Sequence, residues 1–318
     1  MELGEILIHR YALRPTQAPN RLSSKALREG ALLRVYFPHL KSFGHADLFV
    51  WPELGDATLP QELKALKDVP FRAGAAALAW AEYEARAVAQ GLSLYDATRT
   101  IPSHQTLTGR DEVRASSAKL KISAADVRQW KEVEAYCLRH PGVRWRFDFN
   151  ALFEHFEDAQ KFWQKVSPEL KARTDFLEDL TGPALMHSEE LHQLVAPTRL
   201  ALDRGLPEIE DLLWVIKPTT FAPDYLFDEV RAFPGQVVLT SNMDHPLGQL
   251  QALHFAQRLH KVAPKQIFGT GLCTQDVYET HAASHWLETR DQALWPTVSS
   301  PIGWPVHLEL EKLSWSAL

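Results

Sequence analysis

From about residue 116 onward, short apolar segments alternate with longer amphipathic segments along the chain. The amphipathic segments at 124–139, 151–166 and 245–262 have apolar residues at helical spacing. Because parallel neighbours cannot be joined by a tight hairpin, this alternation predicts parallel strands connected by helices. The predicted strands are residues 118–123, 143–150, 175–178, 199–203, 213–217, 236–241 and 266–269.

The first third of the chain has a different pattern. Residues 5–13 and 32–37 are predicted strands separated by a polar, basic loop at 19–30, and 47–51 is a candidate third strand. The Ala-rich segment 73–89 has the small and apolar residues of a buried helix. Strands followed by helices predict an α+β domain. We therefore divide the chain into an α+β domain over 1–100, completed by about 290–318, and a second domain over 101–289.

Charged residues on the predicted strands decide between an open sheet and a closed barrel. Strands buried on both faces should be almost wholly apolar, yet five consecutive strands carry charges in or at their carboxyl-terminal halves. In an open sheet these groups would spread over roughly 19 Å, whereas the strand ends of a (β/α) barrel meet around one axis. We therefore predict a (β/α) barrel. The charged residues are Lys119, Lys121, Asp148, Glu178, Asp203 and Lys217.

Composition narrows the class of protein. The 318 residues are 45% hydrophobic and 23% charged, as in an ordinary globular protein. The net charge of −6, without a polybasic run, argues against a nucleic-acid partner. Cys137 and Cys273 are too few for a disulfide framework or a Cys-based zinc site. Neither a signal peptide nor a membrane-spanning segment is evident, so we expect a cytoplasmic protein without membrane partners.

The charged groups point to metal-assisted proton abstraction. Strand periodicity puts Lys119 and Lys121 on one face, and Arg146, Asp148 and Asn150 likewise share a face. Three carboxylates around one cavity repel each other unless a cation binds, and the lack of His or Cys favours Mg²⁺ over zinc. A bound Mg²⁺ stabilises the negative charge that develops when a proton is removed next to a carboxylate. A lysine beside a second lysine and a cation loses its proton more readily, so it can act as the base.

Each residue taken singly has an ordinary structural explanation. A Lys-x-Lys pair is usually a solvated strand edge, and an Asp that ends a strand is often a helix N-cap. Six such residues in order along successive strands favour one site instead. Residues 269–271 contain only part of a dinucleotide-binding fingerprint, so NAD is not expected.

The order Lys-x-Lys, Asp-x-Asn, Glu, Asp, Lys resembles the enolase superfamily and, within it, the o-succinylbenzoate synthases of menaquinone biosynthesis. The resemblance implies an enolase-type (β/α) barrel with an α+β capping domain. It also implies a Mg²⁺-dependent hydro-lyase that dehydrates the cyclohexadiene carboxylate SHCHC in a syn reaction through an enediolate. The matching segments are AKLKIS, RFDFN, FLEDL, LALDR, VIKPT and VLTSNMDHPLG, at 118–123, 146–150, 176–180, 200–204, 215–219 and 238–248.

The resemblance also implies roles for individual residues. Asp148, Glu178 and Asp203 are the implied Mg²⁺ ligands, Lys121 the base, and Lys217 the ammonium that holds the enediolate. The implied substrate-binding residues are Lys119, Asn150, Ser241 and Asn242, with the Ser241–Asn242 turn donating backbone N–H groups to the succinyl carboxylate. Arg146 and Gly269 match positions near the site. The chain departs from the family pattern with Asp179-Leu180 in place of Glu-Pro and with Arg204 in place of Glu.

Two other functions remain open. The same lysines suit an N-acylamino acid racemase or a dipeptide epimerase, because Lys121 and Lys217 could supply one base on each face of a small carboxylate. Loops within residues 14–31 are expected to decide between these substrates. A barrel without catalysis, acting as a binding protein, is the third alternative, and the presence of all five catalytic-type residues argues against it.

Overall fold

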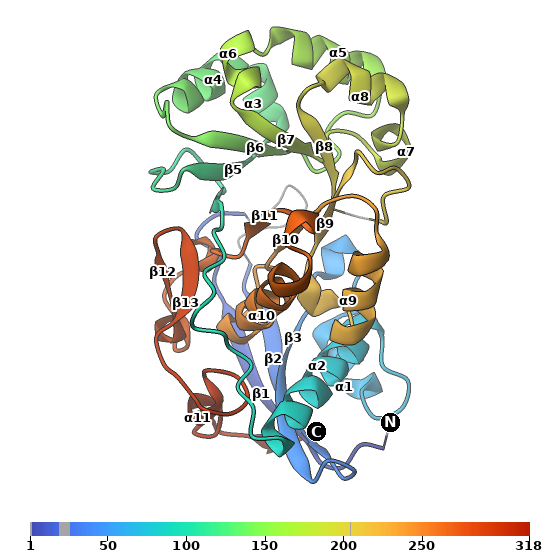
Figure 1. Ribbon diagram of the computed structural model, residues 1–318, viewed down its shortest axis with the longest axis vertical. Coiled ribbons are helices and arrows are strands. Elements are labelled where there is room, and N and C mark those ends of the chain that lie inside the picture. Colours follow the sequence, from blue (N-terminus) through green and yellow to red (C-terminus); the bar gives the residue numbers. More distant parts are fainter. Residues whose placement is uncertain (1, 19–25, 204) are drawn as a thin grey trace.

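The structure, a computed structural model, describes residues 2–18, 26–203 and 205–318 (Figure 1). Its largest sheet has eight strands in the order β4 to β11, each parallel to the next. The strands are β4 (Gln105–Leu107), β5 (Ser117–Lys121), β6 (Arg144–Asp148), β7 (Thr174–Glu178), β8 (Arg199–Leu202), β9 (Leu213–Ile216), β10 (Val237–Thr240) and β11 (Ile267–Gly271).

The eight strands form a nearly closed barrel, which confirms the predicted fold class. At the seam, Gln105 forms a parallel bridge with Cys273, and the N–H of His104 donates to the carbonyl of Thr270 at 2.9 Å. Seven of the strands correspond to predicted ones. The first, β4, was not predicted because a three-residue strand is too short to show a periodic pattern.

Helices cover the outside of the barrel strands, and Figure 1 shows α3 to α8 beside β5 to β8. The single helix predicted over 124–139 is wrong: it is divided at Gln129, whose φ of −105° and ψ of 32° interrupt it. The helix predicted from residue 151 begins only at Phe156, because Asn150 and Ala151 have φ of 50° and 56°. The helices are α3 (Ala124–Arg128), α4 (Trp130–Leu138), α5 (Phe156–Lys165), α6 (Pro168–Ala172), α7 (Pro183–Met186), α8 (Glu189–Val195), α9 (Pro223–Ala232) and α10 (Pro246–Val262). Across the described ranges, no helix has the length and apolar character needed to cross a bilayer.

The N-terminal segment forms a separate antiparallel sheet. Strand β2 (Arg28–Phe37) pairs with β1 (Ile6–Leu13) and β3 (Ser42–Phe49), and the C-terminal β14 (Ser316–Ala317) pairs with β1. Two predictions are corrected here: the third strand starts at Ser42, and residues 28–30 of the predicted loop belong to β2. Residues 19–25 of that loop lie outside the described residues. The remaining α-helices and strands are α1 (Leu59–Ala65), α2 (Arg72–Ala89), β12 (Leu287–Arg290), β13 (Ala293–Pro296) and α11 (His307–Leu310).

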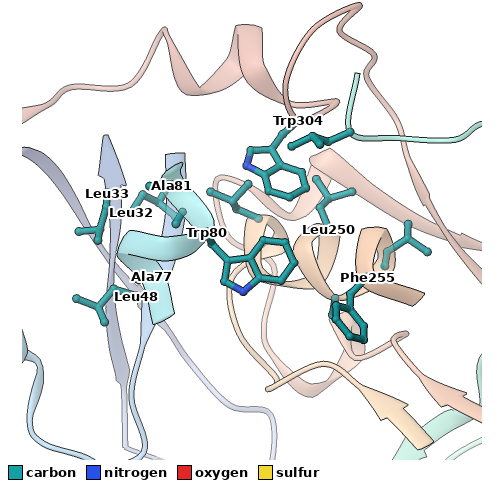
Figure 2. Packing of buried hydrophobic residues seen from close by; sticks show 14 of the residues in the cluster. Leu32, Leu33, Leu48, Ala77, Trp80, Ala81, Leu250, Phe255 and Trp304 are labelled. Carbon is teal, nitrogen blue, oxygen red and sulfur yellow. The ribbon is translucent and has the colours of Figure 1, made fainter. Parts of the chain in front are cut away.

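Helix α2 joins the antiparallel sheet to the barrel through a shared apolar core. Figure 2 shows α2 between the sheet and α10, with the Trp80 ring on the side of α10. The indole of Trp80 is 1% exposed, and its N–H donates to the carbonyl of Pro218 at 3.2 Å. Because Pro218 directly follows Lys217, this contact fixes the backbone at the end of β9. The labelled neighbours are Leu32, Leu33 and Leu48 of the sheet, and Leu250 and Phe255 of α10.

A buried carboxylate, Glu84 on α2, ties the sheet to the C-terminal segment. Its Oε2 lies 2.5 Å from the backbone N and 2.9 Å from ring Nδ1 of His45. Its Oε1 accepts the N–H of Trp304 at 3.0 Å and lies 3.2 Å from Nδ1 of His307. Burial raises the pKa of Glu84, but His45 and His307 lower it by more, to about 2. The hydrogen bond to Glu84 in turn raises the pKa of His307.

We expect Glu84→Gln to lower the free energy of unfolding by about 2–3 kcal/mol near pH 6, because it leaves a buried ionic cluster incomplete. A carboxylate with a lowered pKa stabilises the folded state fully above its ordinary pKa of 4.5 and loses this effect as pH falls toward 2. The raised pKa of His307 acts oppositely: its contribution is present at low pH and is lost as pH rises through that pKa.

Urea unfolding between pH 6 and pH 3.5 measures the Glu84 contribution, because the His307 contribution changes only above its ordinary pKa of 6.5. The wild type should lose more stability over this range than Glu84→Gln does. Glu82→Gln, on the same helix, is the matched control because Glu82 is partly exposed and pairs with His39. Equal stability of Glu84→Gln and the control at pH 6 would contradict the role of the buried cluster.

Candidate active site

The carboxyl ends of the barrel strands bring nine predicted site residues to one cavity. Lys121 is in register with Asp148, and Asp148 with Glu178, so these three side chains form one row across β5, β6 and β7. Asp203 and Lys217 directly follow the ends of β8 and β9. The nine are Lys119, Lys121, Asp148, Asn150, Glu178, Asp203, Lys217, Ser241 and Asn242.

Each carboxylate of the cavity contacts an ammonium group. The Lys119 Nζ lies 2.8 and 2.9 Å from the two carboxylate oxygens of Glu178 and 3.2 Å from Asp148 Oδ2. The Lys121 Nζ lies 3.3 Å from the same oxygen of Asp148, and the Lys217 Nζ contacts Asp203 Oδ1. Burial lowers the pKa of Lys119, but Glu178 and Asp148 raise it by more. Lys119 therefore carries a positive charge beside these two carboxylates.

The positive charges of the lysines do not fully offset the burial and mutual repulsion of the three carboxylates. Burial raises the pKa of Asp148 and of Asp203, but the lysines lower both below the ordinary value. For Glu178, burial together with the charges of Asp148 and Asp203 outweighs Lys119 and raises the pKa to about 7. A cation bound among these oxygens would offset the repulsion between the carboxylates. A set of three carboxylates suits Mg²⁺, which prefers oxygen ligands and keeps open positions for water or substrate.

Neighbouring residues position the carboxylates. The side-chain N–H of Asn150 donates to Asp148 Oδ1 at 2.8 Å. Asn150 was predicted to bind substrate, and this hydrogen bond already uses one N–H of its amide. Asp179 accepts the backbone N–H of Asp203 at 3.0 Å. Burial, and then the charges of Asp203 and Glu178, raise the pKa of Asp179. The sequence marked Asp179 only as a departure from the family pattern, whereas the structure shows that it fixes the backbone of a predicted ligand.

The loops after the barrel strands hold strained backbone conformations. Asn150, Ala151, Asp179 and Met243 have φ of 50°, 56°, 44° and 51°, in the left-handed region that non-glycine residues rarely adopt. All four lie within three residues of the end of β6, β7 or β10, and Asn150 and Met243 line the cavity. Such conformations persist where the surrounding contacts hold them, and they concentrate at functional sites.

Two predicted residues lie beneath the cavity rather than in its lining. Arg146 is in register with Lys119, one layer below Asp148, and its Nε donates to Asp175 Oδ2 at 3.3 Å. Gly269 faces the same guanidinium: a Cβ at this position would lie 2.7 Å from it. Gly269 therefore leaves room for Arg146.

The Ser241–Asn242 turn after β10 lines the cavity, but the backbone N–H of Ser241 is already hydrogen-bonded within the protein. The N–H of Ser241 donates to the carbonyl of Gly271 at 3.1 Å, and its Oγ lies 2.7 Å from Thr274 Oγ1. The carbonyl of Asn242 accepts the indole N–H of Trp51 at 3.1 Å. The predicted donation of backbone N–H groups by the Ser241–Asn242 turn therefore does not hold for Ser241, because the pairing of β10 with β11 extends through this residue.

Several lining residues were not predicted. Among the described residues, the N-terminal domain contributes Trp51 and Leu54 to the cavity. The loop at 14–31, which was expected to decide the substrate, includes 19–25, outside the described residues. No local pattern marks these positions, since only the approach of distant segments brings them to the barrel. The others are His104, Thr106, Thr240, Met243, Gly271 and Thr274.

Lys217 and Asp203, which form an ion pair, line both the cavity and a larger cleft beside it. The cavity itself has about 40 Å³ of free space, enough for water, whereas the adjoining cleft has about 500 Å³. Both are lined by Lys217, Asp203, Trp51, Leu54 and Asn242.

Comparisons with known proteins agree with this fold. Residues 6–87 match the family model described as "O-succinylbenzoate synthase, N-terminal domain". The o-succinylbenzoate synthase of Bdellovibrio bacteriovorus is 26% identical over 327 residues, covering 97% of each chain. That of Vibrio cholerae is 28% identical over 218 residues, covering 62% of this chain and 59% of the relative. Among solved structures, the L-Ala-D/L-Glu epimerase of Bacillus subtilis has a TM-score of 0.73 at 14% identity, covering 93% of this chain and 96% of that one.

The chain combines acidic and ammonium groups at the mouth of a parallel barrel with an antiparallel N-terminal sheet. In fold and in sequence it resembles enzymes of the enolase superfamily. Within that superfamily it is similar to the o-succinylbenzoate synthases.

Proposed function

We propose that the chain is a Mg²⁺-dependent o-succinylbenzoate synthase that removes water from SHCHC, a step of menaquinone biosynthesis. The observation that carries the proposal is the row formed by Lys121, Asp148 and Glu178, which puts a candidate base beside a candidate ion site. The similarity to a synthase over 97% of the chain supports the choice of substrate.

In this proposal Asp148, Glu178 and Asp203 would hold the ion. A bound Mg²⁺ would supply positive charge that stabilises the substrate carboxylate as it becomes an enediolate. Lys121, whose Nζ lies 3.3 Å from Asp148 Oδ2, takes the proton from the carbon next to that carboxylate. The same lysine then returns the proton to the departing hydroxyl. The C–O bond breaks as the ring double bond forms, and water leaves from the face on which the proton was removed.

Lys217 and Lys119 supply fixed charge. Strand β9 is four strands from β5 in the eight-stranded order, so Lys217 approaches the cavity from the side opposite Lys121. Its ammonium would pair with the enediolate after leaving Asp203. Lys119 contacts both Glu178 and Asp148, so in this proposal its charge would act on the substrate carboxylate and on Lys121.

The opposed lysines also favour a second candidate function, racemisation of an N-acylamino acid or epimerisation of a dipeptide. These reactions need one base on each face of the substrate carbon, and Lys121 and Lys217 meet that requirement. Dehydration uses only one of them as a base. The two functions therefore differ in what Lys217 must do.

We expect purified protein to convert SHCHC with Mg²⁺, to lose activity in EDTA, and to regain it with excess Mg²⁺. The assay follows product absorbance, and N-acylamino acids are offered separately in D₂O to detect exchange of the α-proton. Fast racemisation without conversion of SHCHC would reverse the order of the two candidates. Inactivity toward both substrate classes would favour a binding protein without catalysis.

A further inference from the structure

We propose that His104 is a substrate-binding residue whose neutral imidazole donates a hydrogen bond from Nε2–H to a carbonyl or carboxylate oxygen of the substrate. This proposal deepens the proposed function and rests on it for the identity of the substrate. The position and protonation of the donor follow from the geometry.

Arg146 fixes the tautomer of His104. The guanidinium Nη1 of Arg146 lies 2.6 Å from His104 Nδ1. Because a guanidinium only donates hydrogen bonds, Nδ1 must accept, and a neutral ring then carries its proton on Nε2. Arg146 is itself held by Asp175 and by the carbonyl of Thr270 at 3.3 Å each. Arg146 is thus a positioning residue that acts through His104.

The surroundings keep the ring neutral. His104 is 1% exposed. Burial lowers the pKa of His104, and the positive charges of Arg146 and Lys119 lower it further. A neutral ring in this position serves as a fixed hydrogen-bond donor, not as a cation.

The Nε2–H donor belongs to a side chain that lines the cavity, and it has no partner in the part of the chain that the structure describes. Nε2 of His104 is buried and has no hydrogen-bond partner among the described residues, while the side chain lines the cavity with Lys119 and Thr106. Across from it, a Cβ on Gly271 would lie 2.4 Å from Nε2, so glycine leaves the ring its space. A buried N–H without a partner is unfavourable, and an oxygen of a bound substrate would satisfy it. The proposed ligand contact therefore accounts for a donor that the protein leaves unpaired.

Two substitutions separate the functions of the two ring nitrogens. His104→Gln places an amide N–H near the position of Nε2, and His104→Asn places an amide oxygen near Nδ1, where it can accept from Arg146. We expect His104→Gln to raise the KM for SHCHC by less than about 3-fold, and His104→Asn to raise it by about 10- to 100-fold. The affinity for o-succinylbenzoate, measured by calorimetry, should change in the same order. An equal loss in both variants, or a larger loss in His104→Gln, would overturn the proposal and leave His104 as a partner of Arg146 only.

A spectroscopic readout tests the contact without relying on variants that fold well. In wild-type enzyme with ¹⁵N-labelled histidine and Mg²⁺, saturating o-succinylbenzoate should shift the Nε2 resonance of His104 more than its Nδ1 resonance. Unchanged resonances at saturation would overturn the contact even when SHCHC is converted. If the wild type neither converts SHCHC nor binds o-succinylbenzoate, the proposed function fails on its own. The same comparison is then made with the N-acylamino acid that the enzyme racemises, and inactivity toward both classes overturns both proposals.

Discussion

Replacing Lys121 by alanine should reduce kcat for SHCHC by about 10³-fold or more, since a positioned general base contributes roughly 10²- to 10⁴-fold. The Lys121 Nζ contacts Asp148 Oδ2, and Lys119 contacts the same oxygen, so Asp148 keeps an ammonium partner when Lys121 is replaced. The variant should therefore fold and bind Mg²⁺. Single-turnover kinetics, with exchange of the α-proton measured in D₂O, separate loss of proton removal from loss of binding.

Lys121→Arg is the matched variant, because it keeps a positive charge next to Asp148 but does not deprotonate near neutral pH. It should be nearly as inactive as Lys121→Ala. If either variant retained more than about a tenth of the wild-type kcat, a loss smaller than general base catalysis supplies, Lys121 would not be the base.

Glu178→Gln should weaken Mg²⁺ binding by at least about 100-fold, and kcat should fall by a comparable or larger factor at fixed Mg²⁺. Loss of a residue that merely orients a metal ligand costs roughly 10- to 100-fold, and loss of a charged ligand should exceed this. Glu178 is 2% exposed and central, with Asp148 and Asp203 on either side. Calorimetric titration with Mg²⁺ gives the affinity directly.

Two other variants serve as comparisons for the Mg²⁺ affinity of Glu178→Gln. Asp203→Asn should weaken Mg²⁺ binding less, because the Asp203 side chain is 18% exposed and water can replace a lost ligand more easily there. Glu169→Gln, on an exposed face of α6, should leave Mg²⁺ affinity unchanged. Unaltered Mg²⁺ dependence in Glu178→Gln would rule out the three carboxylates as the ion site.

Local patterns were sufficient to predict most of the barrel and the main side chains of its mouth. Lys119, Asp148 and Glu178 could be placed because strand periodicity fixes the face of each side chain and a barrel fixes where strands end. The predicted helix over 124–139 failed at Gln129, where one residue outside helical geometry separates α3 from α4. The spacing of apolar residues is the same on both sides of Gln129, so it does not reveal the interruption.

Other parts of the site depend on contacts between segments far apart in the chain. His104 precedes a strand of three residues, and its partner Arg146 lies 42 positions later. Trp51 reaches Asn242 across 191 positions. Asp179 holds the backbone of Asp203, an arrangement that depends on the spacing of β7 and β8. None of these pairs leaves a periodic signal.

The sequence by itself determined that buried strands carry acids and amines on one face, because the alternation of strand side chains is a local property of the backbone. Only the tertiary structure decided which hydrogen-bonding groups are already used and which are left over. Ser241 gives its N–H to β11, while the Nε2–H of His104 has no partner among the described residues. That difference depends on which distant segments the closed sheet brings next to each donor.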